Sequence, residues 1–167
     1  MKAQTEQSVK EMIDALEDAV DSTGAVTRSK TDQRKDAAWC QGAPGVLLGL
    51  TIAWENGFRT DPEVLHNLAR YVRQRGVGNN STVCHGDLGS LRVLKRYAEL
   101  VNDEALAASM HKEIVNRSKY ITSREKTNYE DKYSSTDSLM LGRAGAILTL
   151  LHELDPQEYP DVTSLGI

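Results

Sequence analysis

Apolar side chains recur along most of the chain at three- and four-residue intervals, the spacing of amphipathic α-helices. Two other stretches are apolar on nearly every side, which is typical of helices in the interior of a protein. Strand-like alternation of apolar and polar residues is essentially missing. The chain is therefore predicted to be all-α. The amphipathic stretches are 9–20, 64–72, 88–98 and 103–115, and the apolar ones are 44–54 and 144–154.

Local signals set the boundaries of these helices. Asp61 followed by Pro62 predicts an N-cap and a first helical turn, and Asp87 is predicted to cap the helix after it. Gly24 and Gly57 predict helix ends. The polar segments 25–36 and 119–136 and the turn 76–80 are predicted to be loops.

A Gly-x-x-Gly motif occurs three times, at 42–45, 86–89 and 142–145, each time at the start of a helix. The helices after the first and third motifs are the strongly apolar ones, and amphipathic helices lie between the motifs. This order predicts stacked helical hairpins with one helix of each pair inside. Glycine at the start of an inner helix allows backbones to approach closely.

The two cysteines occupy the same position of this repeat, because Cys40 and Cys84 each lie two residues before the first glycine. His85 follows the second cysteine. Thiolates and an imidazole on neighbouring repeats are suited to a three-ligand zinc site with an open fourth position. Two simpler interpretations stay open: the cysteines fill apolar space, or they form a disulfide.

Composition narrows the classes of function. The chain has 167 residues, a formal net charge of −4 and no apolar run long enough to span a bilayer. We therefore expect no nucleic-acid partner and no membrane span. The polar start, residues 1–10, lacks the apolar core of a secretion signal. We predict a cytoplasmic protein, in which thiols or metal ligands are more common than disulfides. His66, His111 and His152 lie on other helices and are predicted to be non-catalytic.

Three motifs together resemble the lanthionine synthetase C-like family. They are Trp39-Cys40-Gln41-Gly42-Ala43-Pro44-Gly45, Cys84-His85-Gly86 and Ser138-Leu139-Met140-Leu141-Gly142-Arg143-Ala144-Gly145. The resemblance runs from about Ala37 to the end and is closest to the C-terminal cyclase region of bifunctional class II lanthipeptide synthetases. It implies two parts: residues 1–36, an N-terminal helix and polar linker, and residues 37–167, the C-terminal part of a cyclase domain.

The resemblance implies a partial α/α toroid of about three stacked helical hairpins. It also implies zinc bound by Cys40, Cys84 and His85. The implied substrate is a dehydrated ribosomal precursor peptide, in which a cysteine thiolate adds to dehydroalanine or dehydrobutyrine to form a thioether. The chain is thus predicted to be a zinc-dependent lanthipeptide cyclase fragment.

The chain also departs from the family pattern. The family's acid and base residues lie in earlier repeats that have no counterpart here, so no catalytic residue is assigned. Gln41 stands where histidine or tyrosine is common. An incomplete ring should leave apolar surface on the inner helices uncovered, and a second chain could complete it.

Two alternative functions remain at this point. One is a non-catalytic, zinc-containing module that binds a peptide or partner, as a truncated remnant of a cyclase. The other is an unrelated α/α-toroid enzyme such as a glycosidase, which needs carboxylates at the ends of inner helices. Only Asp87 and Asp137 lie near those positions.

Overall fold

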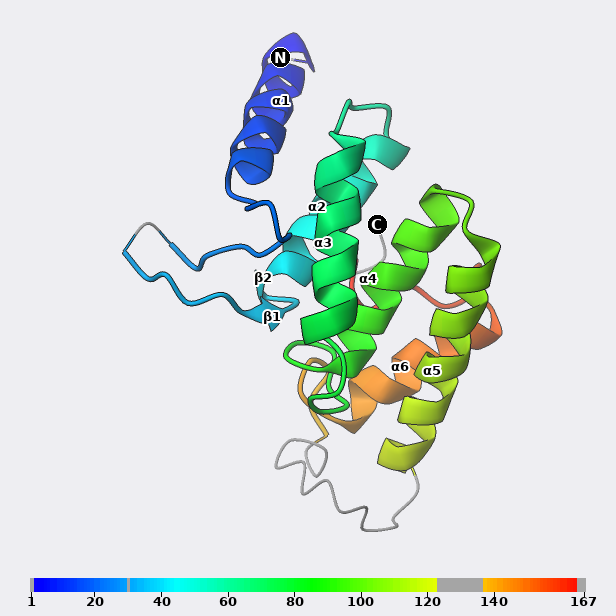
Figure 1. The fold of residues 1–167 in the computed structure, drawn as a ribbon. Helices are drawn as coiled ribbons and strands as arrows, with labels where there is room; N and C mark the ends of the chain where they lie inside the picture. The colour runs from blue at the N-terminus through cyan, green and yellow to red at the C-terminus, as the bar shows by residue number, and fades with distance from the viewer. Residues whose placement is uncertain (1, 30, 123–136, 165–167) are drawn as a thin grey trace.

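The computed structural model describes residues 2–29, 31–122 and 137–164 (Figure 1). Within them the chain forms helices and one short hairpin of two-residue strands, β1 and β2, paired antiparallel. The all-α prediction is confirmed. The elements are α1 (Lys2–Asp18), β1 (Ala37–Ala38), β2 (Gln41–Gly42), α2 (Ala43–Glu55), α3 (Pro62–Arg75), α4 (Asp87–Leu100), α5 (Glu104–Thr122) and α6 (Arg143–Leu154).

The helices are arranged as a partial α/α toroid, as predicted. α4 lies at the centre and packs against α2, α3 and α5, whereas α6 packs against α5. α2, α4 and α6 each begin at a glycine motif, and α3 and α5 lie between them in the chain. α1 reaches the rest of the molecule mainly through α2 and stands apart at one end (Figure 1). The predicted loop at 119–136 is helical up to Thr122, and 123–136 lie outside the described residues.

The core is centred on α4, which is buried from Asp87 to Leu94. The leucine stripe of α4 predicted one buried face. The helix is buried on more than that face, because α2, α3 and α5 all pack against it. Most of the largest fully buried side chains come from α2, α3, α4 and α5. They include Leu47, Leu50, Leu65, Leu68, Leu88, Leu91, Leu94, Met110 and Ile114.

The second glycine of each motif lies against the backbone of the loop that precedes it. A methyl group on Gly45, Gly89 or Gly145 would come within 2.3, 1.9 and 1.9 Å of the carbonyl oxygen six residues earlier. No side chain fits at such a distance. The close backbone approach predicted for these glycines is therefore confirmed, and it brings each loop down onto the start of its own inner helix.

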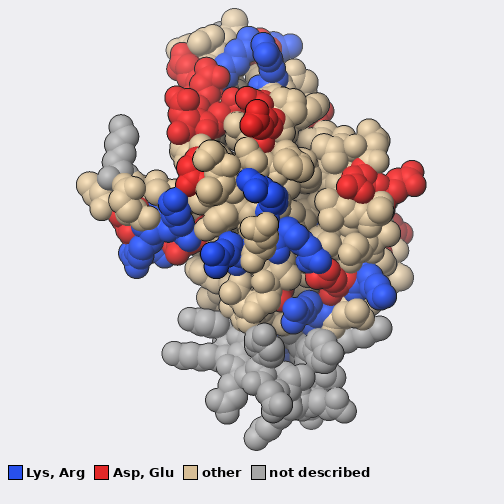
Figure 2. All heavy atoms as spheres, in the orientation of Figure 1, with Lys and Arg blue, Asp and Glu red and all other residues tan. Residues whose placement is uncertain are grey.

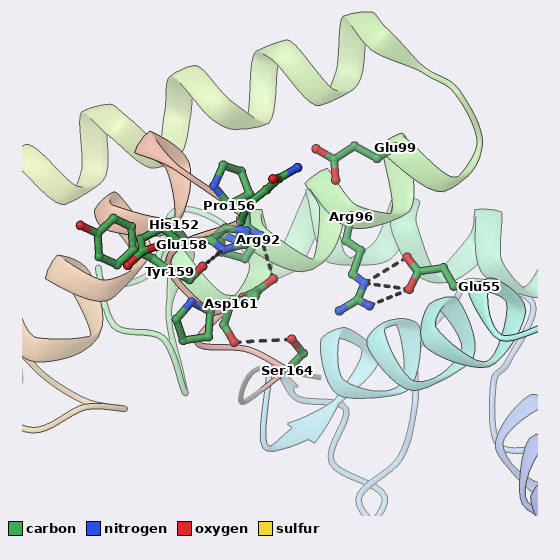
Figure 3. A pocket seen from close by; sticks show the side chains of 12 residues that line it. Glu55, Arg92, Arg96, Glu99, His152, Pro156, Glu158, Tyr159, Asp161 and Ser164 are labelled. Carbon is green, nitrogen blue, oxygen red and sulfur yellow. Dashed lines mark hydrogen bonds and ion pairs between the residues drawn. The ribbon is translucent and has the colours of Figure 1, made fainter.

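The segment after α6 folds back onto α4. Arg92 of α4, 3% exposed, forms an ion pair with Glu153 of α6. It forms a second ion pair, at 2.7 Å, with Asp161 of this segment (Figure 3). The indole N–H of Trp39 donates to the Thr163 carbonyl at 3.1 Å. Residues 161–164 are buried and tie α4, α6 and the β hairpin together. A polar cavity of about 460 Å³ remains between α4 and this segment.

Candidate metal centre

Cys40 lies in the two-residue turn of the β1–β2 hairpin and is exposed, and β2 leads directly into α2. The hairpin closes at Gly42, whose φ is 123°. A side chain there would also lie 2.0 Å from the Asp36 carbonyl oxygen. Glycine is therefore required at this position, both for its backbone conformation and for the space. The result is a sharp turn with the Cys40 thiol accessible from solvent.

Cys84 and His85 lie in the loop that leads into α4. Cys84 is buried and His85 is exposed. Backbone hydrogen bonds align the three motif loops: the Trp39 N–H donates to the Cys84 carbonyl, and the Cys84 N–H donates to the Met140 carbonyl, each at 2.9 Å. The repeat therefore brings the loops of three inner helices to one end of the molecule, as the matched positions of the cysteines indicate.

The three predicted ligands converge in the structure. One ligand atom each from Cys40, Cys84 and His85 can be chosen so that all three lie within 4.8 Å of one another. The Cys40 Sγ lies 3.4 Å from the His85 Nε2. Tetrahedral zinc with bonds of about 2.3 Å to sulfur and about 2.0–2.1 Å to nitrogen separates such atoms by roughly 3.6 Å. The donor set and its spacing therefore fit a metal ion.

Both cysteines are free thiols in the structure. Burial, followed by the neighbouring Cys40, raises the pKa of Cys84 to about 12. Without a cation beside it, this thiol stays protonated at neutral pH. A metal bound here must displace that proton, so binding is coupled to proton release. The exposure of Cys40 argues against the interpretation that both cysteines fill apolar space.

The remaining histidines lie elsewhere. His66 is exposed on α3. The His111 Nδ1 contacts the Glu153 carboxylate, and the His152 Nδ1 lies 2.7 Å from the Tyr159 carbonyl oxygen. Among the described residues, the group formed by Cys40, Cys84 and His85 is the one cluster of histidine, cysteine and carboxylate side chains that could hold a metal.

The prediction that Asp87 caps α4 is wrong. Gly86 is the N-cap of α4, and Asp87 is the first helical residue. Its Oδ1 accepts backbone hydrogen bonds from Gly78 and Asn79, each at 2.9 Å, and its Oδ2 lies 3.1 Å from the Arg117 Nε. The carboxylate reaches back to the preceding turn, because that turn presents two N–H groups. Burial raises the pKa of Asp87.

The second carboxylate noted near the start of an inner helix, Asp137, is exposed, and its Oδ1 accepts from the Arg143 Nε at 2.8 Å. Asp87 and Asp137 thus both have partners within their own loops or helix ends. No sequence pattern pointed to Asn80 and Thr82, whose side chains contact the loop of Cys84 and His85. Asn80 lies within the turn predicted at 76–80, whereas Thr82 lies outside it.

The family model for lanthionine synthetase C-like proteins matches residues 2–164. The chain belongs to this family. The match includes α1 and the whole candidate metal centre. No curated protein and no solved structure was found to match the chain. Within the described residues, no helix of this family member is long and apolar enough to cross a membrane.

Proposed function

We propose that this chain is part of a zinc-dependent lanthipeptide cyclase and that Cys40, Cys84 and His85 are its zinc ligands. The observation that carries the proposal is their convergence: donor atoms from two loops, 45 residues apart in the chain for Cys40 and His85, lie within 4.8 Å of one another. Membership of the lanthionine synthetase C-like family supports the same function.

The donor types favour zinc over other common metals. Two thiolates and an imidazole are soft or borderline ligands, whereas magnesium and calcium prefer oxygen. Structural zinc sites usually have four protein ligands, and catalytic ones have three and an open position. Three donors with exposed Cys40 and His85 correspond to the second arrangement. A peptide thiol can therefore approach from solvent.

The proposed reaction forms a thioether within a dehydrated ribosomal precursor peptide. A peptide cysteine loses its thiol proton, its sulfur adds to the β-carbon of dehydroalanine or dehydrobutyrine, and a proton is delivered to the α-carbon. When bound, zinc lowers the pKa of a thiol that coordinates it. The chain's contribution is to hold three ligands on loops that are hydrogen-bonded to one another at one end of its inner helices.

The finer points of the proposal concern the rest of the cyclase. The similarity to bifunctional class II synthetases suggests that residues 37–167 correspond to the C-terminal part of the cyclase domain, with 1–36 as an N-terminal helix and linker. The acid and base are proposed to come from outside these repeats, from a second chain that completes the ring. A cytoplasmic location accords with a reaction on reduced thiols.

The first test compares zinc binding by two histidine variants of the reduced chain. We expect about one zinc per wild-type chain and loss of most of it in His85→Ala, because one of three ligands is removed. His66→Ala is the matched control, since His66 is also exposed but lies on α3. Zinc content is measured by elemental analysis after gel filtration. Equal zinc in both variants, or none in the wild type, contradicts the proposed site.

The second arm tests chemistry with a model peptide that carries one cysteine and one dehydroalanine. Ring closure consumes the free thiol, so mass spectrometry after alkylation follows it. Faster closure with the zinc-loaded chain than with His85→Ala supports a cyclase. Stoichiometric zinc without any faster closure supports the alternative, a zinc-containing peptide- or partner-binding module.

A further inference from the structure

The loop that carries Cys84 and His85 is wrapped by the turn that precedes it. Residues 78–82 form this turn, and residues 84–87 form the ligand loop. Two hydrogen bonds join the turn to the main chain of His85: the His85 N–H donates to the Thr82 Oγ1 at 3.3 Å, and the Asn80 Nδ2 donates to the His85 carbonyl at 3.2 Å. Both peptide groups of His85 are therefore held by side chains of the turn.

Asn80 is the centre of this network. Its Oδ1 accepts from the Thr82 N–H at 3.0 Å and from the Thr82 hydroxyl at 2.7 Å, and its carbonyl accepts from the Asp87 N–H at 2.6 Å. Because the Thr82 hydroxyl donates to Asn80 and accepts from His85, the three residues form a continuous hydrogen-bonded chain. Such chains fix geometry more firmly than separate bonds do.

Close packing adds to the hydrogen bonds. A methyl group on Gly86 would lie 2.2 Å from the Asn80 Oδ1 and 2.3 Å from the Asn80 carbonyl oxygen. Asp87 holds the other end of the turn through the backbone N–H groups of Gly78 and Asn79. The turn and the ligand loop are thus locked together at both ends.

We propose that Asn80 is a positioning residue for the candidate metal centre, which fixes the backbone of His85 so that its imidazole faces the two thiols. This inference rests on the proposed metal-binding function. The backbone conformation of His85 sets the direction of its Cα–Cβ bond, so an exposed imidazole can be held 3.4 Å from the Cys40 sulfur without being buried. Groups that orient metal ligands typically change metal affinity by 10- to 100-fold when removed.

The test measures zinc affinity of the full chain by competition with a chromophoric chelator. We expect Asn80→Ala to weaken zinc binding by roughly 10- to 100-fold and Asn79→Ala to leave it unchanged. Asn79 is the matched control because it is the adjacent asparagine, and its Nδ2 donates to the Arg75 carbonyl of α3 instead of to the ligand loop. Equal zinc affinity in the two variants overturns the proposal.

A second measurement needs no metal. Hydrogen–deuterium exchange of the zinc-free chain should be faster at the Thr82 and His85 amides in Asn80→Ala than in Asn79→Ala. The Asn80 Oδ1 accepts from the Thr82 N–H, and it also holds the Thr82 hydroxyl that accepts from the His85 N–H. Unchanged exchange at both amides contradicts the positioning role. If wild type binds no zinc, the proposed metal-binding function fails, and the exchange experiment still decides whether Asn80 orders this loop.

A third variant keeps the test valid if Asn80→Ala does not fold, which circular dichroism reveals. Asn80→Asp retains an acceptor for Thr82 but cannot donate to the His85 carbonyl. We expect its zinc affinity to fall at least tenfold below that of Asn79→Ala. An affinity equal to the control shows that the donation to His85 has no role in positioning.

Discussion

At the scale of single residues, the most demanding feature outside the candidate metal centre is a buried arginine. Arg92 is 3% exposed and lies between two carboxylates, Glu153 and Asp161. The Lys95 Nζ is also 2.9 Å from Glu153. Burial raises the pKa of Asp161, but the charge and hydrogen bond of Arg92 outweigh it and leave the pKa below its ordinary value. The pKa of Glu153 is lowered in the same way by its cationic neighbours.

We predict that Arg92→Met lowers the free energy of unfolding by about 3–5 kcal/mol at neutral pH, because it leaves Asp161 buried without its cation. The measurement is urea unfolding followed by circular dichroism. Arg73→Met is the matched control, since Arg73 pairs with Glu113 at 2.6 Å on the surface. It should cost less than about 1 kcal/mol. Equal losses in the two variants would show that the buried pair contributes nothing special.

The sign of the pH dependence provides a further check on this prediction. In the wild type the lowered pKa values of Glu153 and Asp161 stabilise the fold above their ordinary values near 4, and this stability is lost as the pH falls through the folded-state values. In Arg92→Met, the buried Asp161 carboxylate has lost the positive charge of Arg92. Protonation of Asp161 therefore removes the cost of burying its negative charge. The difference in stability between wild type and variant should therefore shrink below about pH 4. A difference that grows on acidification contradicts this assignment.

At the scale of elements, the helices and the convergence of Cys40, Cys84 and His85 were predictable, but the contacts that hold the loop of Cys84 and His85 were not. Long periodic stripes such as 64–72 identify helices, and the repeat places Cys40 and Cys84 at the same end of neighbouring ones. The strands β1 and β2 have two residues each, which is too short for an alternation of apolar and polar residues to be detected. The hydrogen bonds of Asn80 and the return of Asp161 to Arg92 depend on side chains that meet only after folding, so no spacing reveals them.

The glycine motifs allow an element-level prediction. Gly89→Ala should lower the free energy of unfolding by about 1–3 kcal/mol, because the added methyl group lies 1.9 Å from the Val83 carbonyl oxygen and the loop must move. Gly49→Ala is the control: it lies within α2 with nothing within 4 Å, so alanine should stabilise it by about 0.5–1 kcal/mol. Chemical unfolding of both variants provides the comparison. Opposite signs are expected, and stabilisation by Gly89→Ala would contradict the close backbone approach.

At the scale of the whole molecule, the partial ring leaves apolar surface at one edge. Ile147 and Leu154 of α6 are 50% and 78% exposed, and Leu139 just before the helix is 42% exposed. Residues seven apart lie on one face of a helix, so Ile147 and Leu154 form a stripe. By contrast, Figure 2 shows charged side chains of both signs over the face that α1 and α3 present. The α6 edge is therefore where a further repeat, or another chain, is expected to pack.

We predict that the chain self-associates as its concentration rises and that Ile147→Lys with Leu154→Lys weakens the association constant at least tenfold. Burial of one large aliphatic side chain contributes about 1.5–3 kcal/mol, and about 1.4 kcal/mol corresponds to tenfold in affinity. Sedimentation velocity over a range of concentrations measures the effect. The control is the single variant Val101→Lys. Val101 is 40% exposed but lies in the α4–α5 turn, outside the stripe. A wild type that stays monomeric, or an equal loss in the control, means that the α6 edge does not mediate association. If the chain does associate through the α6 edge, a chain that completes the ring is expected to bind the same surface and to compete with self-association.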